Sequence, residues 1–229
     1  MQALPMEFDF VGNDGCDGIG GVAVVIDVLR AYSFAAFALD AGAERLILMD
    51  DLEATLALAS AIPGALAGKD GRPEDGFELF NSPGQVLERT DLAGRTIVHR
   101  TSAGTIGAVA ARHAPHVFGA SFVVAEATVR RVLEVDPVQV TFVITGDDGR
   151  SEEDLVCAEY LRARLEGERP DPAPYLARAE RAGERLRRAV ELGYPGVHAD
   201  DVDLCLDLDR FDFAMRARDE DGLLTLRRD

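Results

Sequence analysis

The segment Gly21–Ser33, with the sequence GVAVVIDVLRAYS, constrains the fold more than any other part of the chain. Its apolar run, Val22–Ile26, shows neither the alternation of a half-buried strand nor the spacing of an amphipathic helix. Such a run is typical of a strand covered on both faces, as in the parallel sheet of an α/β protein. Ligands of open α/β sheets bind beyond the carboxyl ends of the strands, so Asp27 and Arg30 stand where chemistry is expected.

Short apolar runs alternate with helical patterns along the chain, which predicts a three-layer α/β/α fold with a largely parallel or mixed sheet. Further strands are expected at Arg45–Met49, Ala65–Ala67, Thr96–His99, Val117–Gly119 and Val138–Thr145. Helices are expected at Ala31–Ala43, Leu52–Ala61, Thr105–His113, Glu126–Glu134, Glu152–Glu166 and Ala173–Leu192. The pattern of Val202–Leu226 indicates a short helix and then two strands. We expect residues 1–229 to form a single domain; two closely packed halves, with a break near residues 167–174, are the alternative.

Composition excludes several classes of protein. A net charge of −17 and a pI near 4.6 argue against general binding to nucleic acid or to acidic membranes, although an acid-rich proteome would give the same balance. Cys16, Cys157 and Cys205 are widely spaced and match neither a disulfide framework nor a zinc site. The N-terminal residues resemble no signal peptide, and no apolar run approaches the roughly 20 residues of a membrane helix. We therefore expect a cytoplasmic protein, and we consider a homodimer for its oligomeric state.

Several familiar catalytic signatures fail on inspection. Residues 18–23 (GIGGVA) match a dinucleotide fingerprint in letters, but they precede their strand, so we interpret them as turn glycines. Residues 64–70 (GALAGKD) are one residue short of a P-loop and lack its Ser or Thr. Leu29 stands where the DxDx[TV] phosphatases require a second aspartate, and no G-x-S-x-G elbow is present.

Four polar segments follow expected strands, and the first contains Asp27 and Arg30. A carboxylate at a strand end can hold magnesium or attack phosphorus, and an arginine can bind phosphate through paired hydrogen bonds. An ordinary structural ion pair at the sheet edge is the alternative. The second segment is the long loop Gly68–Pro83, which carries cations, glycines and an Asn-Ser-Pro sequence. Its alternative interpretation is an exposed loop in which Ser82 caps a helix that begins at Pro83.

The third segment is Arg100–Thr105, where small hydroxyl residues and a glycine could form an anion site at a helix N-terminus. Capping by Ser102 is the alternative, and the two roles are compatible. The fourth is Thr145–Asp154, whose acidic residues could complete a magnesium site. Ser151 and Asp154 also have the spacing of a capping box, which the local pattern favours. All four segments could face the same edge of the sheet.

The order and wording of these segments resemble the 2-phosphosulfolactate phosphatase family, also called ComB-like. The matching stretches read DVLRAYS (27–33), GFELFNSP (76–83), RTSAGT (100–105), GASFVVA (119–125) and TGDDGRSEED (145–154). The end of the chain, LGYPGVHADDVDLCLDLDRFDFAM, is also similar to the family's ending. The resemblance implies a three-layer α/β/α fold and Mg²⁺-dependent hydrolysis of a phosphate monoester on a small anionic acid. 2-Phosphosulfolactate or a related phosphorylated hydroxy acid is the implied substrate.

Carried onto this sequence, the resemblance makes particular residues candidates for the site. The implied catalytic residues are Asp27, Arg30 and Asp154, and the implied metal ligands are Asp27, Glu153 and Asp154. The implied substrate-binding residues are Asn81, Ser82, Thr101, Ser102, Gly104 and Thr105. The chain departs from the family pattern at Lys69-Asp70, at Phe80 and at Ala103, which removes a side chain able to bond substrate. These departures motivate an alternative, a non-catalytic binder or sensor of a phosphorylated or sulfonated metabolite.

Overall fold

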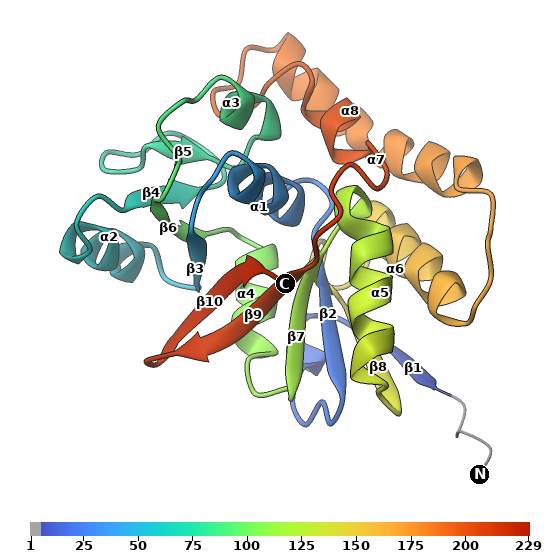
Figure 1. Ribbon diagram of the computed structural model, residues 1–229. Helices are drawn as coiled ribbons and strands as arrows, with labels where there is room; N and C mark the ends of the chain where they lie inside the picture. The colour runs from blue at the N-terminus through green and yellow to red at the C-terminus, as the bar shows by residue number, and fades with distance from the viewer. Residues whose placement is uncertain (1–5) are drawn as a thin grey trace.

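The buried strand expected from the sequence, β2 (Val22–Ile26), lies between β7 (His116–Ala120) and β8 (Gln139–Ile144) and is parallel to both. This is a computed structural model that describes residues 6–229 (Figure 1). Alternate β2 side chains enter two apolar clusters, one on each face of the sheet. Val22, Val24 and Ile26 enter one cluster, whereas Ala23 and Val25 enter the other. Both faces are covered, which is why the strand is apolar throughout.

Within residues 6–229, ten strands form one sheet in the order β1-β8-β2-β7-β9-β10-β3-β6-β4-β5. The first four strands are mutually parallel, and so are the last four. The hairpin of β9 and β10 joins the two groups and pairs antiparallel with each of them. The sheet is therefore mixed, as predicted. The residue bounds of the other seven strands are β1 (Glu7–Val11), β3 (Arg45–Met49), β4 (Leu66–Lys69), β5 (Leu79–Phe80), β6 (Thr96–Arg100), β9 (Met215–Glu220) and β10 (Leu223–Arg228).

The two groups of strands run in opposite directions, so their carboxyl ends would lie at opposite edges of a flat sheet. Sheets twist by roughly 20–25° per strand, and β2 and β6 are separated by five steps in the strand order. The accumulated rotation of roughly 100–125° brings the loop after β6 towards the loop after β2. The expectation of one shared edge is therefore wrong in detail. The loops meet because the sheet twists between two oppositely directed halves.

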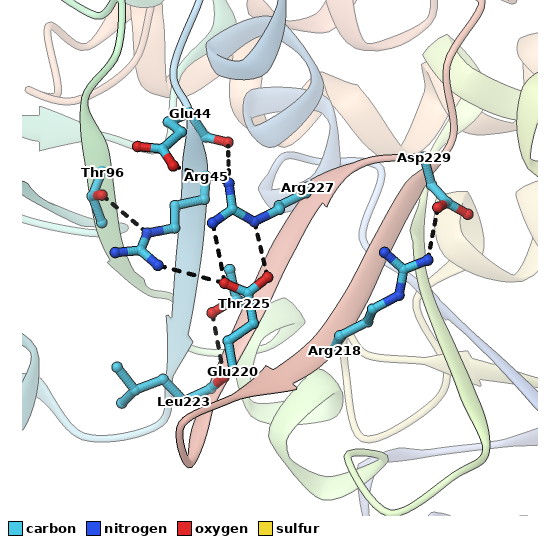
Figure 2. Close-up of polar contacts among 9 residues, drawn as sticks. All are labelled: Glu44, Arg45, Thr96, Arg218, Glu220, Leu223, Thr225, Arg227 and Asp229. Atoms are coloured by element: carbon cyan, nitrogen blue, oxygen red, sulfur yellow. Dashed lines mark hydrogen bonds and ion pairs between the residues drawn. The ribbon is translucent and has the colours of Figure 1, made fainter.

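Polar side chains link the joining hairpin to its neighbour β3 (Figure 2). Arg227 on β10 donates from Nε to Glu220 on β9 at 2.9 Å and from Nη1 to Glu44 at 3.2 Å. Arg45 on β3 pairs through Nη1 with Glu220 on β9 at 3.5 Å, and its Nε donates to the Thr96 hydroxyl of β6 at 3.1 Å. Because these ion pairs are partly exposed, each contributes at most about 1 kcal/mol, and the backbone ladder does most of the joining.

Helices cover both faces of the sheet, which completes the three layers (Figure 1). The cluster of Ala23 also contains side chains of α1 (Ala31–Asp40), α3 (Pro83–Leu87) and α4 (Gly104–Ala110). The cluster of Val22 contains side chains of α5 (Ala125–Val135), α6 (Glu152–Leu165), α7 (Ala173–Glu191) and α8 (Asp201–Cys205). The remaining helix, α2 (Leu52–Ala61), packs against β3, β4 and β6. Of the helices in this described part, none is long and apolar enough to cross a bilayer.

Most expected elements are confirmed, within a few residues at their ends. The structure adds β1 near the N-terminus, where EFDFV mixes charged and apolar residues in a largely exposed edge strand. It also adds β5, whose two residues are too few to leave a pattern in the loop Gly68–Pro83. Residues 167–174, where the sequence suggested a break, connect α6 to α7, and these two helices pack against each other.

Candidate functional site

A cavity of about 430 Å³ opens where the loops after β2, β6 and β8 meet the side of α7. The loops contribute Leu29, Arg30, Ser102, Ala103, Gly146, Asp147 and Ser151, and the first turn of α6 contributes Glu153. Helix α7 contributes Ala182, Arg185, Leu186 and Ala189. Three of the four polar segments found in the sequence therefore meet at this cavity. The second segment, Gly68–Pro83, reaches it only through side chains that contact its lining.

Asp27 follows β2 directly and is 6% exposed. Its Oδ1 accepts a hydrogen bond from the Ala31 amide at 2.9 Å, which fixes the side chain at the start of α1. Burial raises the pKa of Asp27 to about 6; hydrogen bonds from the backbone of Ala31 and Gly104 oppose this rise, and the charges of Asp70 and Glu153 add to it. Within residues 6–229 no ion pair joins Asp27 to a cation. A carboxylate that is costly to ionise suits a metal ion or a proton-transfer role.

Asp154 lies in the first turn of α6 and is 2% exposed. Its Oδ1 accepts from the Val28 amide at 2.8 Å, and its Oδ2 accepts from the Gly146 amide at 3.2 Å. The carboxylate thus joins the loop after β8 to the loop after β2. Burial, and next the charge of Asp27, raises the pKa of Asp154 well above its usual range.

The capping-box interpretation of this turn is wrong. Ser151 occupies the N-cap position of α6, but its side chain makes no capping hydrogen bond within the described residues. Asp154 bonds to two other loops instead of completing the box. Glu153 lines the cavity beside it, and its negative charge raises the pKa of both Asp27 and Asp154.

Of the two roles that the sequence left open for Arg30, the structure shows an ion pair, formed with Asp201. The Arg30 guanidinium lines the cavity, but its Nη1 also donates to the Gly196 carbonyl at 3.0 Å and forms an ion pair with Asp201. Asp201, whose side chain is completely buried, additionally accepts hydrogen bonds from the amides of Gly84 and His198, both at 2.9 Å. The charge of Arg30 is therefore compensated inside the protein. Sequence reasoning missed Asp201, because nothing distinguishes it from its acidic neighbours.

Ser82 and Asn81 lie one step further from the cavity. Ser82 caps α3, as proposed, by accepting from the Gln85 amide at 3.3 Å, and its hydroxyl donates to Asp201 at 2.8 Å. Through Asp201 it supports Arg30. Asn81 is 4% exposed, and its side-chain oxygen has no hydrogen-bond partner in residues 6–229.

The turn before α4 holds the remaining candidates. Thr101 and Thr105 bond each other: the Thr105 amide donates to the Thr101 hydroxyl at 3.1 Å, and the Thr101 amide donates to the Thr105 hydroxyl at 2.7 Å. Ser102 lines the cavity, and its amide donates to the carboxylate of Asp70 at 2.8 Å. The capping role considered for Ser102 is wrong, since Ala103 is the N-cap residue. Three amides of the expected anion site, those of Thr101, Ser102 and Thr105, are thus already bonded.

Gly104 brings this turn against Asp27. A Cβ atom at Gly104 would lie 2.7 Å from Asp27 Oδ2 and 2.7 Å from the Cβ of Ala31. Only a residue without a side chain permits this approach. The glycine therefore sets how closely the loop after β6 approaches the carboxylate after β2.

Comparisons with known proteins fit this arrangement. Residues 14–220 match the family model described as 2-phosphosulpholactate phosphatase. The chain belongs to this phosphatase family. It is 37% identical over 196 residues to a probable 2-phosphosulfolactate phosphatase of Deinococcus radiodurans, with 82% of this chain and 81% of the relative covered. A protein of the same name from Thermus thermophilus is 38% identical over 182 residues, covering 76% of this chain and 71% of that protein. Another from Bacillus subtilis is 24% identical over 209 residues, covering 90% and 91%.

Membership of this family places the chain among the phosphoric monoester hydrolases, as the sequence motifs indicated. The family model covers every loop that lines the cavity, together with Asp201. It also covers α7, which forms the opposite wall. The chemistry of a phosphatase is thus to be sought among these residues.

Proposed function

We propose that this chain hydrolyses 2-phosphosulfolactate or a related phosphorylated hydroxy acid with the help of Mg²⁺. One observation carries the magnesium proposal: Asp27 and Asp154 are two buried carboxylates that repel each other, and the charge of Glu153, which lines the cavity, acts on both. Residues 6–229 contain no group of three or more His, Cys, Asp or Glu side chains placed to hold a metal ion. Mg²⁺ is commonly held by one or two carboxylates, with waters and substrate phosphate completing the octahedron. Asp27 and Asp154, with Glu153 nearby, fit that pattern.

Charge also favours a cation in this site. Glu153 lines the cavity and its charge acts on both Asp27 and Asp154, whereas the charge of Arg30 is already balanced by Asp201. A phosphate dianion would meet net repulsion there. A bound Mg²⁺ supplies the positive charge that neutralises the phosphate oxygens and lowers the pKa of a bound water.

Residues of the chain would then bind the phosphate and assist its transfer to water. Arg30, held by Asp201, presents its guanidinium towards the phosphate as charge develops in the transition state. In hydrolysis the ester P–O bond breaks, the oxygen of water joins phosphorus, and the alkoxide takes up a proton to give the free hydroxy acid. Asp27 either holds the cation or attacks phosphorus itself, and its raised pKa is compatible with both roles. In the second case the ester P–O bond breaks as the Asp27 oxygen joins phosphorus, and water then breaks the bond between phosphorus and Asp27 to release phosphate.

The test is phosphate release from a panel of small phosphorylated acids, with Mg²⁺ and with a chelator. We expect activity that requires Mg²⁺, loss of at least 100-fold in Asp27→Asn and Asp154→Asn, and little change in Asp203→Asn, an exposed acid of α8. Undiminished turnover in Asp27→Asn would exclude both roles for that carboxylate.

A binder or sensor of the same ligands remains the second candidate. The observation that favours it is the bond between Asp70 and Ser102, because a carboxylate occupies an amide expected to bind substrate. Tight binding of a phosphorylated acid with no phosphate release across the whole panel would support this candidate over the enzyme.

A further inference from the structure

Helix α7 forms the wall of the cavity opposite the polar loops. Its lining residues Ala182, Arg185, Leu186 and Ala189 recur at the spacing of a single helical face. Three of them are apolar, so Arg185 is the polar group that this wall offers to a ligand.

Among the described residues, two cationic side chains line the cavity, and they differ in how free they are to bind an anionic ligand. Arg30 is bound to a completely buried carboxylate, Asp201. The nearest acid to Arg185 is Asp147, at 3.8 Å, and the two side chains are 86% and 66% exposed. An exposed pair at this distance is weak, so an anionic ligand can readily replace Asp147.

A second unused polar group lies next to that acid. Ser151 lines the cavity and is 5% exposed, yet its hydroxyl oxygen has no hydrogen-bond partner within residues 6–229. Its amide donates to the Gly146 carbonyl at 3.1 Å, in the turn that also carries Asp147. A buried hydroxyl without a partner is uncommon in folded proteins, and one that lines a cavity is free to bond to a ligand there.

We propose that Arg185 is a specificity-determining residue that binds a second acidic group of the substrate, a carboxylate or sulfonate, with the Ser151 hydroxyl as a further donor. The inference rests on the proposed function, in which the phosphate lies towards Arg30. A guanidinium can form two parallel hydrogen bonds to either group. A phosphate monoester without a second acid would gain nothing from Arg185.

The experiment compares 2-phospholactate with isopropyl phosphate, in which a methyl group replaces the carboxylate. In Arg185→Ala we expect KM for 2-phospholactate to rise about tenfold or more with kcat nearly unchanged, while KM for isopropyl phosphate stays the same. Arg185→Lys should recover part of the loss. Arg181→Ala is the matched control, because Arg181 is an exposed arginine of α7 outside the cavity lining.

Binding of the non-hydrolysable phosphonates of both compounds, measured by titration calorimetry, gives the same comparison without turnover. If Arg185→Ala weakens binding of the acid-bearing phosphonate alone, the role of Arg185 is supported, even if the protein releases no phosphate. A lack of phosphate release would refute only the proposal that the chain is an enzyme. Equal effects on both compounds, or none on either, would overturn the assignment of Arg185.

Discussion

Arg30 and Asp201 form a buried ion pair between residues 171 positions apart in the chain. The pair joins the loop after β2 to the start of α8, and so holds the C-terminal part of the chain against the site. We expect Asp201→Ala to lower the free energy of unfolding by about 3–5 kcal/mol, because it leaves a buried guanidinium without its counter-charge. Urea denaturation measures this loss.

Asp203 provides the control for that measurement. It lies on the same short helix, but it is 68% exposed and pairs with the partly exposed Arg187. Asp203→Ala should therefore change stability by about 1 kcal/mol or less. Comparable losses in the two variants would mean that Asp201 does not anchor Arg30.

The sequence predicts local structure here because the local signals agree with the tertiary environment. The run Val22–Ile26 is apolar on both faces since helices cover both, and Asp27 ends it where the site begins. Ser82 followed by Pro83 marks the start of α3 for equally local reasons. The Ser82 hydroxyl caps the helix, and Pro83 has no backbone N–H that would need a hydrogen-bond acceptor. Such features depend on neighbours in the chain.

Long-range features could not be predicted in this way. The direction of the strand groups depends on a hairpin, β9–β10, that comes last in the sequence and enters the middle of the sheet. Asp201 and Arg185 gain their positions only from contacts made across the fold. Asp154 was found as an acidic residue, but its two bonds to other loops outweigh the capping box that its spacing suggests.

A substitution at Gly104 should disturb the site from the side of α4. In Gly104→Ala the new Cβ would lie 2.7 Å from Asp27 Oδ2, so the turn or the carboxylate must move. We expect a loss of about 1–3 kcal/mol in stability, together with a fall in phosphatase kcat. Gly20→Ala is the control, because its nearest new contact would be 3.7 Å away. Equal effects of the two substitutions would argue against a packing role for Gly104.

His99 should make stability depend on pH. Its ring is 1% exposed, packs on Phe34 with ring centroids 4.7 Å apart, and has no partner for Nε2 in residues 6–229. Burial lowers the pKa of His99 from 6.5 to about 4, against a weaker opposing effect of the Asp70 charge. The unfolded chain therefore binds a proton first as pH falls. Between about pH 6.5 and 4 this histidine should cost roughly 3 kcal/mol of stability.

The measurement is the difference in unfolding free energy between wild type and His99→Leu across that range of pH. Taking this difference removes the contribution of groups such as Asp27. The raised pKa of Asp27 has the opposite effect, because the protein loses stability as pH rises through about 6. We expect the variant to lose less stability on acidification than the wild type. His113→Gln, at an exposed histidine, should keep the wild-type slope. A parallel slope in His99→Leu would contradict the prediction.

Mg²⁺ should stabilise the folded chain even without substrate. Asp27 and Asp154 are buried and raise each other's cost of ionisation, so a cation that binds both relieves a repulsion present only in the folded state. At a Mg²⁺ concentration 100 times its Kd, linkage gives about 2.7 kcal/mol, or a rise in Tm of roughly 5–10 °C for a chain of this size. Asp154→Asn should abolish most of this rise, whereas Asp203→Asn should retain it. A chelator should reverse it, and an equal rise in Asp154→Asn would place the cation elsewhere on this acidic protein.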